Sequence, residues 1–564
     1  MSLLNFIRSS TFWELMGWLA FALVGVMFIA SDFRRTLARW QQITLLLALV
    51  GLVFLNRLLL LLFNLELNPD ESQLLSQAIT LFHHPIYWKS TDGATMGPLS
   101  SYFASVPAYL GFPLDYITLR WSAFFCIATG LVTGYFTLEN FFGARTARLA
   151  LFPAAAFLSF TQHFDFLHAT NEQLSLALLG ICFWMYSRMW RQQAYDSVPK
   201  LFLLSFVASM VPFAKLQGTP IALVIIGITF LGILEQYPGM RPGQFWWAFS
   251  SFIVGGLVFP IFVLLMTFKF NVFDDFMHYY FLANFSYSAG GSFWSYLSNF
   301  PAFVGRTTDF LFFVLPTFVL FISWAVFSRQ GHKRVFLFTL ASIMASMYSV
   351  VKPGNEFIHY LLYLVFPISL LNACLLDSQR APVYGVAWVA LVFVLTAVCV
   401  DSQFDDFERS FASQYRREPL RHRHPPGSLI SNEIKKYAKA GEYLVVWGWA
   451  PRYNVETQMP QGVCDNHTIR CVLGDPKEQL IHRERYIRNL RTSRPPIFVD
   501  AVGPNSVWLQ QREEHGYETF PELKDFINKH YQYAGEIQKT RIYVRTDRYL
   551  ESVRPIAIRT PYVD

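Results

Sequence analysis

The segment Leu58–Pro85, LLLLLFNLELNPDESQLLSQAITLFHHP, connects the end of a long apolar run to a polar stretch that contains two adjacent acids. The apolar run, residues 41–63, is long enough to cross a bilayer as a helix. Asp70 and Glu71 follow soon after it. Two interpretations of this acid pair are open: the carboxylates complement the dipole of a helix that begins beside them, or they carry out chemistry at the membrane surface.

The composition of the whole chain agrees with a membrane protein. Of its 564 residues, 53% are hydrophobic and only 15% are charged. These values are typical of a polytopic α-helical membrane protein. Apolar runs of about 17 to 25 residues predict about twelve transmembrane helices. They are expected near residues 11–30, 41–63, 117–138, 148–162, 170–188, 201–215, 218–234, 246–268, 308–327, 335–351, 357–376 and 382–401.

The last predicted span ends shortly before residue 402, where the composition becomes polar. We therefore predict a transmembrane domain at 1–401, a linker at 402–427 and a soluble domain at 428–564. Helix-type and strand-type segments alternate in the last part, which favours a small α/β domain. These segments are ISNEIKKYAKAG (430–441), EYLVVWGW (442–449), PPIFVDAV (495–502), FPELKDFINKHY (520–531) and TRIYVRT (540–546).

The distribution of basic residues predicts the orientation of the spans. When the spans alternate, the basic loops all fall on one side, which the positive-inside rule assigns to the cytoplasm. The loop with Asp70, the segment Phe270–Arg306 and the C-terminal domain then face outward. The net charge of +7 follows from these loops, and the soluble part has no basic, aromatic-interleaved patch of the kind that binds nucleic acid. The basic loop residues are Arg34, Arg35, Arg39, Arg145, Arg148, Arg188, Arg191, Lys200, Arg329, Lys333 and Arg334.

The first outward loop is predicted to contain interfacial helices. Asn68 suits an N-cap, Pro69 the first helical position and Glu71 a capping box. The helix that follows is amphipathic, so it can lie in the membrane interface, and the segment GPLSSYFASVPAYLGF (97–112) is expected to do the same. Its apolar stripe is Leu74, Leu75, Ala78, Ile79 and Phe82, and the polar residues Gln73, Ser76, Gln77 and Thr80 lie opposite.

A second acidic region lies in the next outward turn, FTQHFDFLHATNEQL (160–174). His163, Asp165 and His168 fall within six residues, and Glu172 opens the next apolar span. Glu172 alone would suit a solvated helix cap. The two imidazoles and the carboxylate also have the donor types of a metal or phosphate site.

Candidate cations occur at other outward turns. Lys215 interrupts an apolar stretch in SMVPFAKLQGTP (209–220), where it either snorkels to the surface or binds an anionic headgroup. Lys352 and His359 lie in a further turn, and Arg57 lies inside the second span. An ionisable group within a span indicates either a functional site or a structural pair, and both remain open for Arg57.

Cys464 and Cys471 are the two cysteines of the predicted soluble domain. Because an outward-facing domain is in an oxidising compartment, a disulfide between them is expected. A zinc site with His467 is the alternative, although this stretch supplies only one nitrogen and two sulfur ligands.

Outward carboxylates and outward cations together suit the transfer of a group from a lipid phosphate, because a carboxylate can accept the proton of an attacking hydroxyl and cations stabilise the departing phosphate. The order of motifs resembles the GT-C superfamily of polyprenyl-phosphate-sugar glycosyltransferases, especially the branch of protein O-mannosyltransferases and the lipid A aminoarabinose transferase. The motifs are NPDES (68–72), TDGATMGPLSSYFASVPAYLGF (91–112), YITLRWSAFF (116–125), ATNEQL (169–174), AKLQGTP (214–220) and FIHYLLYLVFP (357–367).

This resemblance implies an inverting glycosyltransferase of the bacterial inner membrane, with its active site and C-terminal domain outside the cytoplasm. The donor would be a sugar on polyprenyl phosphate, surrounded by membrane lipids, and the acceptor a glycan, lipid or protein. Asp70 would be the catalytic base and Glu71 its neighbour. The donor phosphate or sugar would be bound by Lys215, His359, Arg57 and Lys352, and the second acidic region would comprise Asp165, Glu172, His163 and His168.

One motif departs from the oligosaccharyltransferase branch of the superfamily. The soluble domain has VVWGWAP (445–451) and not a tryptophan-tryptophan-aspartate motif. The resemblance therefore does not imply asparagine glycosylation or a required cofactor, and a divalent metal is left open. Two other functions are also left open: a catalytically degenerate structural subunit of a membrane complex, and a transporter of a lipid-linked substrate.

Overall fold

The structure is a computed structural model that describes residues 10–34, 37–286, 291–327, 333–377, 382–403 and 427–553. It divides into two compact units. The helical unit comprises Met1–Phe63, Thr95–Ser100 and Leu119–His422, and the mixed unit comprises Asn64–Ala94, Ser101–Thr118 and Arg423–Asp564. Most residues of the predicted first outward loop thus group with the C-terminal part of the chain. Of the predicted linker 402–427, residues 404–426 lie outside the described residues.

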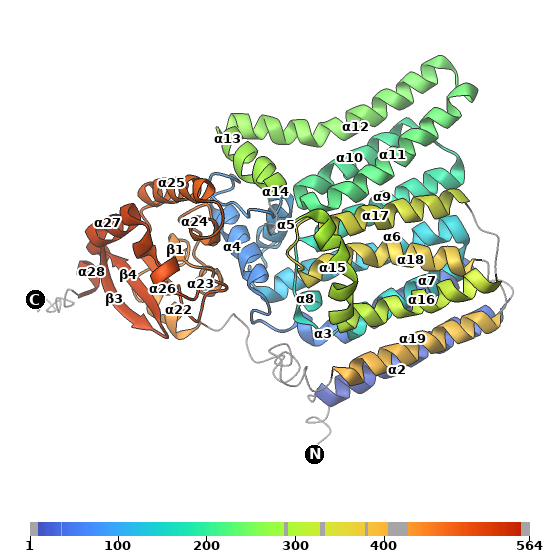
Figure 1. Ribbon diagram of the computed structural model, residues 1–564, viewed down its shortest axis with the longest axis horizontal. Helices are drawn as coiled ribbons and strands as arrows, with labels where there is room; N and C mark the ends of the chain where they lie inside the picture. Colours follow the sequence, from blue (N-terminus) through green and yellow to red (C-terminus); the bar gives the residue numbers. More distant parts are fainter. Residues whose placement is uncertain are drawn as a thin grey trace, which may run out of the picture. The chain divides into compact units, whose positions relative to one another are not determined.

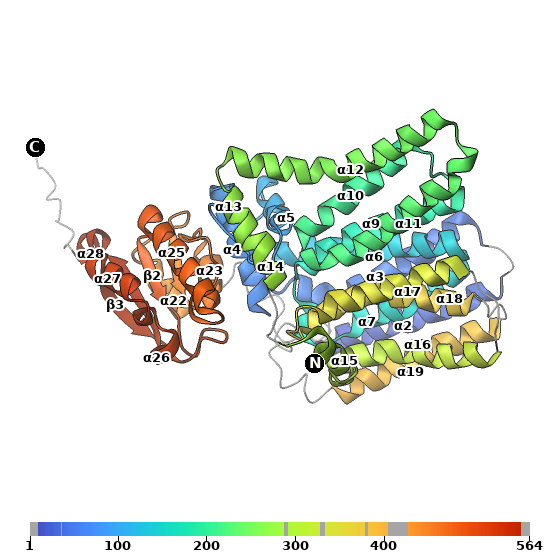
Figure 2. The same ribbon diagram turned by 45° about the horizontal axis from the view of Figure 1, so that its top comes forward.

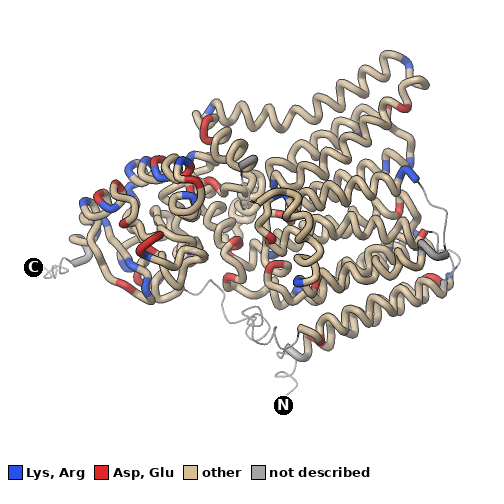
Figure 3. The backbone as a smooth tube through the Cα atoms, in the orientation of Figure 1, with Lys and Arg blue, Asp and Glu red and all other residues tan. Residues whose placement is uncertain are grey.

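Long helices that lie side by side build the helical unit (Figures 1 and 2). Each of the predicted spans contains one of them, because each apolar run is a continuous helix-forming sequence. Figure 3 shows that charged residues are sparse between their ends. The helices are α2 (Ser10–Asp32), α3 (Arg39–Leu61), α6 (Tyr116–Phe142), α7 (Ala144–Phe160), α9 (Glu172–Gln192), α10 (Val198–Ala214), α11 (Thr219–Gln236), α12 (Pro242–Lys269), α16 (Thr308–Phe327), α17 (Lys333–Val351), α18 (Leu362–Leu376) and α19 (Pro382–Ser402).

The predicted number of twelve membrane spans is not confirmed. Among the described residues, eight helices are long and apolar enough to cross a membrane, or nine if the bent pair Phe293–Arg306 and Thr308–Ser323 forms one span. The helices α7 and α10 have only 17 residues each, and they fall short of that length. The apolar helices nevertheless identify the protein as an integral membrane protein.

Shorter elements occupy the turns of the helical unit. They are α8 (Phe164–Leu167), the 3₁₀ helices η1 (Leu216–Gly218), η2 (Tyr237–Gly239) and η4 (Ile358–Leu361), the π-helix η3 (Phe276–Leu282), and the α-helices α13 (Phe273–Asp275), α14 (Ala283–Ser286) and α15 (Phe293–Arg306). The second long outward segment is therefore largely helical. A π-helix is uncommon and often marks a functional region.

The mixed unit contains a four-stranded sheet in the order β1-β2-β4-β3. The strands β1 (Leu444–Trp447) and β2 (Ile497–Asp500) are parallel, whereas β4 (Thr540–Arg545) is antiparallel to both β2 and β3 (Tyr531–Ile537). Because side chains alternate along a strand, β1 contributes to a core on each face of the sheet. The helices of the C-terminal part are α22 (Leu429–Ile434), α23 (Arg452–Thr457), α24 (Ile469–Val472), α25 (Pro476–Ser493), α26 (Arg512–His515), η6 (Tyr517–Thr519), α27 (Pro521–His530) and α28 (Thr546–Val553).

The strand β3 was not among the predicted segments, because the predicted helix 520–531 extends to its first residue. The structure ends α27 at His530 and begins β3 at Tyr531 without an intervening loop. Gly535 in β3, at φ +151, coincides with an irregularity in the pairing with β4. This bulge obscures the alternation by which a strand is recognised in a sequence.

The helix α4 (Pro69–His83) is buried on both faces, which differs from the predicted interfacial helix. A helix at a membrane interface would keep its polar face in water. Instead, the polar residues Gln73, Ser76, Gln77 and Thr80 are all buried within the mixed unit. Asn466 donates to the carbonyl of Gln73, and the backbone N–H of Gln461 donates to Thr80 Oγ1. The other predicted interfacial segment forms α5 (Pro98–Tyr109).

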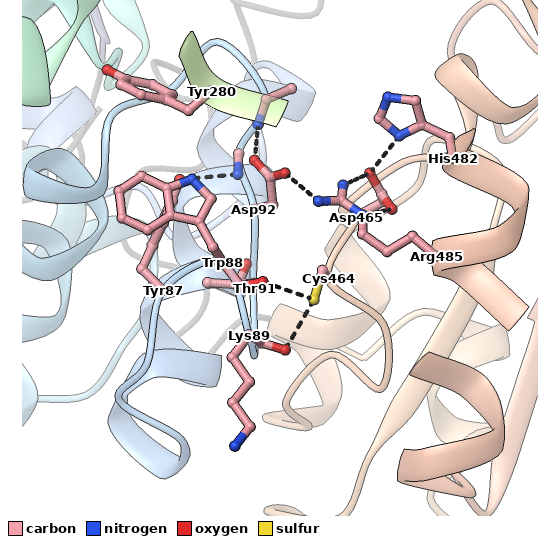
Figure 4. Close-up of polar contacts among 12 residues, drawn as sticks. Tyr87, Trp88, Lys89, Thr91, Asp92, Tyr280, Cys464, Asp465, His482 and Arg485 are labelled. Carbon is pink, nitrogen blue, oxygen red and sulfur yellow. Dashed lines mark hydrogen bonds and ion pairs between the residues drawn. The ribbon is translucent and has the colours of Figure 1, made fainter. Parts of the chain in front are cut away.

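A buried ion-pair network joins the loop after α4 to α25 (Figure 4). Arg485 Nη1 lies 2.7 Å from Asp92 Oδ2, and the Arg485 guanidinium also pairs with Asp465. His482 Nδ1 lies 3.3 Å from Asp465 Oδ1. Burial alone would raise the pKa of Asp465, but Arg485 and His482 together outweigh it and lower the pKa well below the ordinary value. The network therefore holds the first outward loop against the C-terminal part with charged groups.

The predicted disulfide is not present in the structure, where Cys464 and Cys471 are separate thiols. Cys464 Sγ lies 2.9 Å from the carbonyl oxygen of Lys89, to which it donates (Figure 4). Cys471 is buried in the core on one face of the sheet. The two thiols therefore lie in different surroundings. Burial raises the pKa of the Cys471 thiol well above its usual range.

Candidate active site

The break between α10 and α11 positions Lys215 at one end of the helical bundle. Pro212 lies in the last turn of α10, and Lys215 leaves the helix with an extended backbone, φ −157° and ψ 124°. Lys215 forms a β-bridge with Met96 in an antiparallel sense. Gly97 allows this approach, because a Cβ there would lie 2.0 Å from the carbonyl oxygen of Phe213. The predicted interruption of the span at Lys215 is therefore confirmed.

Lys215 and Glu172 form a buried ion pair. Lys215 Nζ lies 3.0 Å from Glu172 Oε1, and the side chains are 5% and 1% exposed. The ammonium also lies 5.7 Å from the ring centroid of Tyr360, within the range of a cation–π interaction. Glu172 is the first residue of α9, where the helix dipole favours a carboxylate. The structure thus joins two residues that the sequence analysis had placed in separate groups.

His359 connects this pair to the second acidic region. Its Nε2 lies 4.0 Å from Glu172 Oε1, and its Nδ1 lies 3.7 Å from Asp165 Oδ2. The rings of His359 and His168 are nearly perpendicular, with centroids 5.5 Å apart. Burial alone would raise the pKa of Asp165, but the adjacent imidazoles of His359 and His168 lower it to about 2. Asp165 is therefore an anion over the whole physiological pH range.

His163 lies in the same turn but is held by another carboxylate. The backbone N–H of His163 donates to Asp309 Oδ2 at 3.0 Å, and burial lowers the pKa of the His163 imidazole. Asp309 lies in the first turn of α16 and also accepts from Gln403 Nε2 at 3.1 Å. The sequence analysis missed Asp309; a lone acid at the start of a strongly apolar span was the available signal.

The surroundings of Arg57 and Lys352 differ from those of the Lys215–Glu172 pair. Arg57 is buried and donates to the carbonyls of Leu158 and Phe166 at 2.9 and 3.0 Å, which ties the end of α7 to α8. It also lines an apolar cavity of about 100 Å³ within the helical unit. Lys352 follows α17 and is only partly buried. Among the described residues these contacts favour the structural interpretation of Arg57.

Asp70 and Glu71 differ from each other in burial. They occupy the first turn of α4 in the mixed unit, where Asn68 Oδ1 accepts from the backbone N–H of Asp70 and caps the helix as predicted. Glu71 is fully buried, and its Oε2 accepts from the backbone N–H of Leu67 at 3.1 Å. Asp70 is only partly buried. The cap therefore fixes the backbone of an acid whose side chain remains accessible.

The helical unit thus contains a compact group of charged and titratable side chains, which we call the Lys215 cluster: Lys215, Glu172, His359, Asp165 and His168. Imidazoles and carboxylates are the types of ligand that bind divalent metals. Within this unit, His168 Nε2 is a buried nitrogen without a hydrogen-bond partner among the described residues. Glu172, in contrast, is already neutralised by an ammonium group. The Lys215 ammonium is the fixed positive charge of the cluster, and it is the group to which an anionic ligand would bind.

Comparisons with known proteins agree with this architecture. No protein-family model and no curated protein matches the sequence. The structure is similar to the crystal structure of ArnT from Cupriavidus metallidurans in the apo state, with a TM-score of 0.52 and 14% identity over 91% of this chain and 99% of that chain.

A weaker likeness exists to an oligosaccharyltransferase from Archaeoglobus fulgidus crystallised with Zn and sulfate. Its TM-score is 0.35, with 12% identity over 86% of this chain and 68% of that chain. Because the ArnT match covers 91% of this chain, it extends over both the helical bundle and the C-terminal sheet. The chain therefore shares the overall fold of the ArnT structure.

Proposed function

We propose that the protein is a membrane glycosyltransferase that transfers a sugar from a polyprenyl-phosphate donor to an acceptor hydroxyl, with inversion at the anomeric carbon. The observation that carries this proposal is the ArnT-like fold, which extends over 91% of the chain. The Lys215 cluster supports it, because a buried cation at a helix break suits an anionic lipid headgroup. The partly exposed Asp70 supports it as a base.

In the proposed reaction the acceptor oxygen attacks the anomeric carbon, and the bond from that carbon to the phosphate oxygen breaks. Asp70 accepts the proton of the attacking hydroxyl. The electron pair of the broken bond stays on polyprenyl phosphate, which leaves with an additional negative charge. Lys215 stabilises that charge, and Glu172 keeps the ammonium in position. The Glu71 carboxylate accepts a hydrogen bond from the backbone N–H of Leu67 and so fixes the backbone that precedes Asp70.

A divalent metal is compatible with part of the Lys215 cluster. His168 and His359 are the residues of the helical unit that would hold it, and the ion would add positive charge for the leaving phosphate. The proposed steps do not depend on it, because Lys215 supplies a fixed cation. We further propose that the reaction takes place on the outer side of the bacterial inner membrane, where a polyprenyl-linked donor is used without nucleotide sugars.

The proposal is tested by reconstitution of the purified protein in liposomes with radiolabelled polyprenyl-phosphate mannose, glucose or aminoarabinose. We expect at least one donor to be consumed, with release of polyprenyl phosphate. Asp70→Asn should reduce the rate by at least 1,000-fold, about 4 kcal/mol of transition-state stabilisation, without loss of folding.

Glu522→Gln is the matched control, because Glu522 follows Pro521 in α27 as Asp70 follows Pro69 in α4. This control should retain full activity. Normal turnover by Asp70→Asn would remove Asp70 from the mechanism. A correctly folded protein that consumes no donor, and that copurifies with other membrane proteins, would favour the structural-subunit alternative.

A further inference from the structure

The loops after β1 and β2 lie at one edge of the sheet in the mixed unit. Because the two strands are parallel, their carboxyl ends point the same way. In open α/β sheets, ligands bind in the crevice outside these ends. Here the loops are GWAPR (448–452) and AVGPNSVWLQ (501–510). They are connected, because the backbone N–H of Trp449 donates to Ser506 Oγ at 2.8 Å.

These loops line a cavity of about 370 Å³ within the mixed unit. We call it the tryptophan cavity, and its lining includes Glu66, Trp449, Arg452, Asn505, Ser506 and Trp508. Its volume lies in the usual range of small-molecule sites, about 300–1,000 Å³.

Two indole rings form a corner of the cavity. The centroids of Trp449 and Trp508 lie 5.2 Å apart, with an angle of 81° between the ring planes. Trp508 is 54% exposed, and its backbone has φ +61°, which is unfavourable for a bulky residue. An exposed aromatic side chain held at a strained backbone position indicates a functional constraint.

Planar polar groups accompany the two rings. Arg452 Nη2 lies 3.5 Å from Asn505 Oδ1, and Glu66 accepts a hydrogen bond from Ser72. Arg452 Nε and Trp449 Nε1 are buried donors without a hydrogen-bond partner among the described residues. Such donors usually find a partner in a folded protein or in its ligand.

We propose that the tryptophan cavity binds a saccharide, as the acceptor subsite of the proposed transferase; the inference rests on that proposed function. A sugar ring offers an apolar C–H face that packs on an indole, and neighbouring hydroxyls that pair with planar guanidinium, amide and carboxylate groups. The perpendicular indoles contact two sides of one ring. At Leu444 the outer edge of β1 pairs with Gln461, so an added peptide strand could not use this end of β1.

The experiment measures saccharide binding in the absence of donor, so that it does not depend on transfer. Full-length protein in lipid nanodiscs is examined by saturation-transfer difference NMR with mannose, galactose and N-acetylglucosamine disaccharides. The same disaccharides attached to a lipid tail are tested in parallel. We expect at least one disaccharide to bind, free or lipid-linked, and Trp508→Ala and Arg452→Gln to weaken it at least tenfold.

Tyr533→Ala is the matched control, since Tyr533 is also 54% exposed in the mixed unit but does not line the cavity. It should bind as the unmodified protein does. The absence of binding, binding that Trp508→Ala leaves unchanged, or binding only of a serine-containing peptide would overturn the proposal. Saccharide binding by a protein that never consumes donor would support the subsite while contradicting the proposed transferase.

Discussion

Lys215 and Glu172, from two different helix ends, form an ion pair of 3.0 Å that is almost fully excluded from solvent. Removal of one partner leaves the other charge buried without compensation. We expect Lys215→Met, which leaves the Glu172 carboxylate unpaired, and Glu172→Gln, which leaves the Lys215 ammonium unpaired, each to destabilise the protein by about 3–5 kcal/mol. Thermal unfolding in detergent measures this.

The double variant Lys215→Met/Glu172→Leu is the control for this pair. It removes both charges, so it should recover part of the stability that each single variant loses. Additive losses in stability would show that the two groups do not interact.

Glu66 should make the stability of the mixed unit depend on pH. Burial raises the pKa of Glu66 from 4.5 to about 7. Between these values the folded state holds a proton that the unfolded state has released, so the free energy of unfolding falls as pH rises from about 4.5 to 7. Glu66→Gln should remove this part of the dependence. Melting temperatures from pH 5 to 8 compare the two proteins, and identical slopes would contradict the prediction.

Arg485 should be essential to the stability of the mixed unit. Its guanidinium is 1% exposed and pairs with Asp92 and Asp465. Arg485→Met leaves two buried carboxylates without their cation, and we expect a loss of about 3–5 kcal/mol. Arg488→Met, an exposed position on the same helix, is the control and should change stability by less than about 0.5 kcal/mol. Limited proteolysis after heating measures the difference in stability between the two variants.

The stability of the protein should not depend on reductant. Cys464 and Cys471 are separate buried thiols, so a reducing agent should leave the melting temperature unchanged. Alkylation after denaturation, without reduction, should label both residues in mass spectrometry. Detection of a peptide pair linked through these two cysteines would contradict this prediction and support the disulfide that the sequence suggested.

Chelation should have little effect on transfer. Lys215 already provides a fixed cation beside Glu172, so EDTA is expected to lower the rate less than tenfold. Activity that disappears with EDTA and returns with one divalent cation would assign a metal to the imidazoles of His168 and His359.

Local sequence signals were sufficient to predict where the long helices lie and where some of them begin or end. Apolar runs predict the positions of the long helices, and Asn68 with Pro69 predicts the start of α4. The polar break at Lys215 predicts the interruption between α10 and α11. These features depend on residues close together in the chain, where periodicity and capping act.

The sequence by itself thus determined an integral membrane protein with a small α/β part and a set of candidate charged residues. Only the tertiary structure decided which of them meet: Lys215 pairs with Glu172, and Arg485 with Asp92, which is far from it in the chain. It also buried the polar face of α4 and kept Cys464 apart from Cys471. The reason is physical: partners of buried polar groups are chosen by packing between distant segments, which leaves no local pattern.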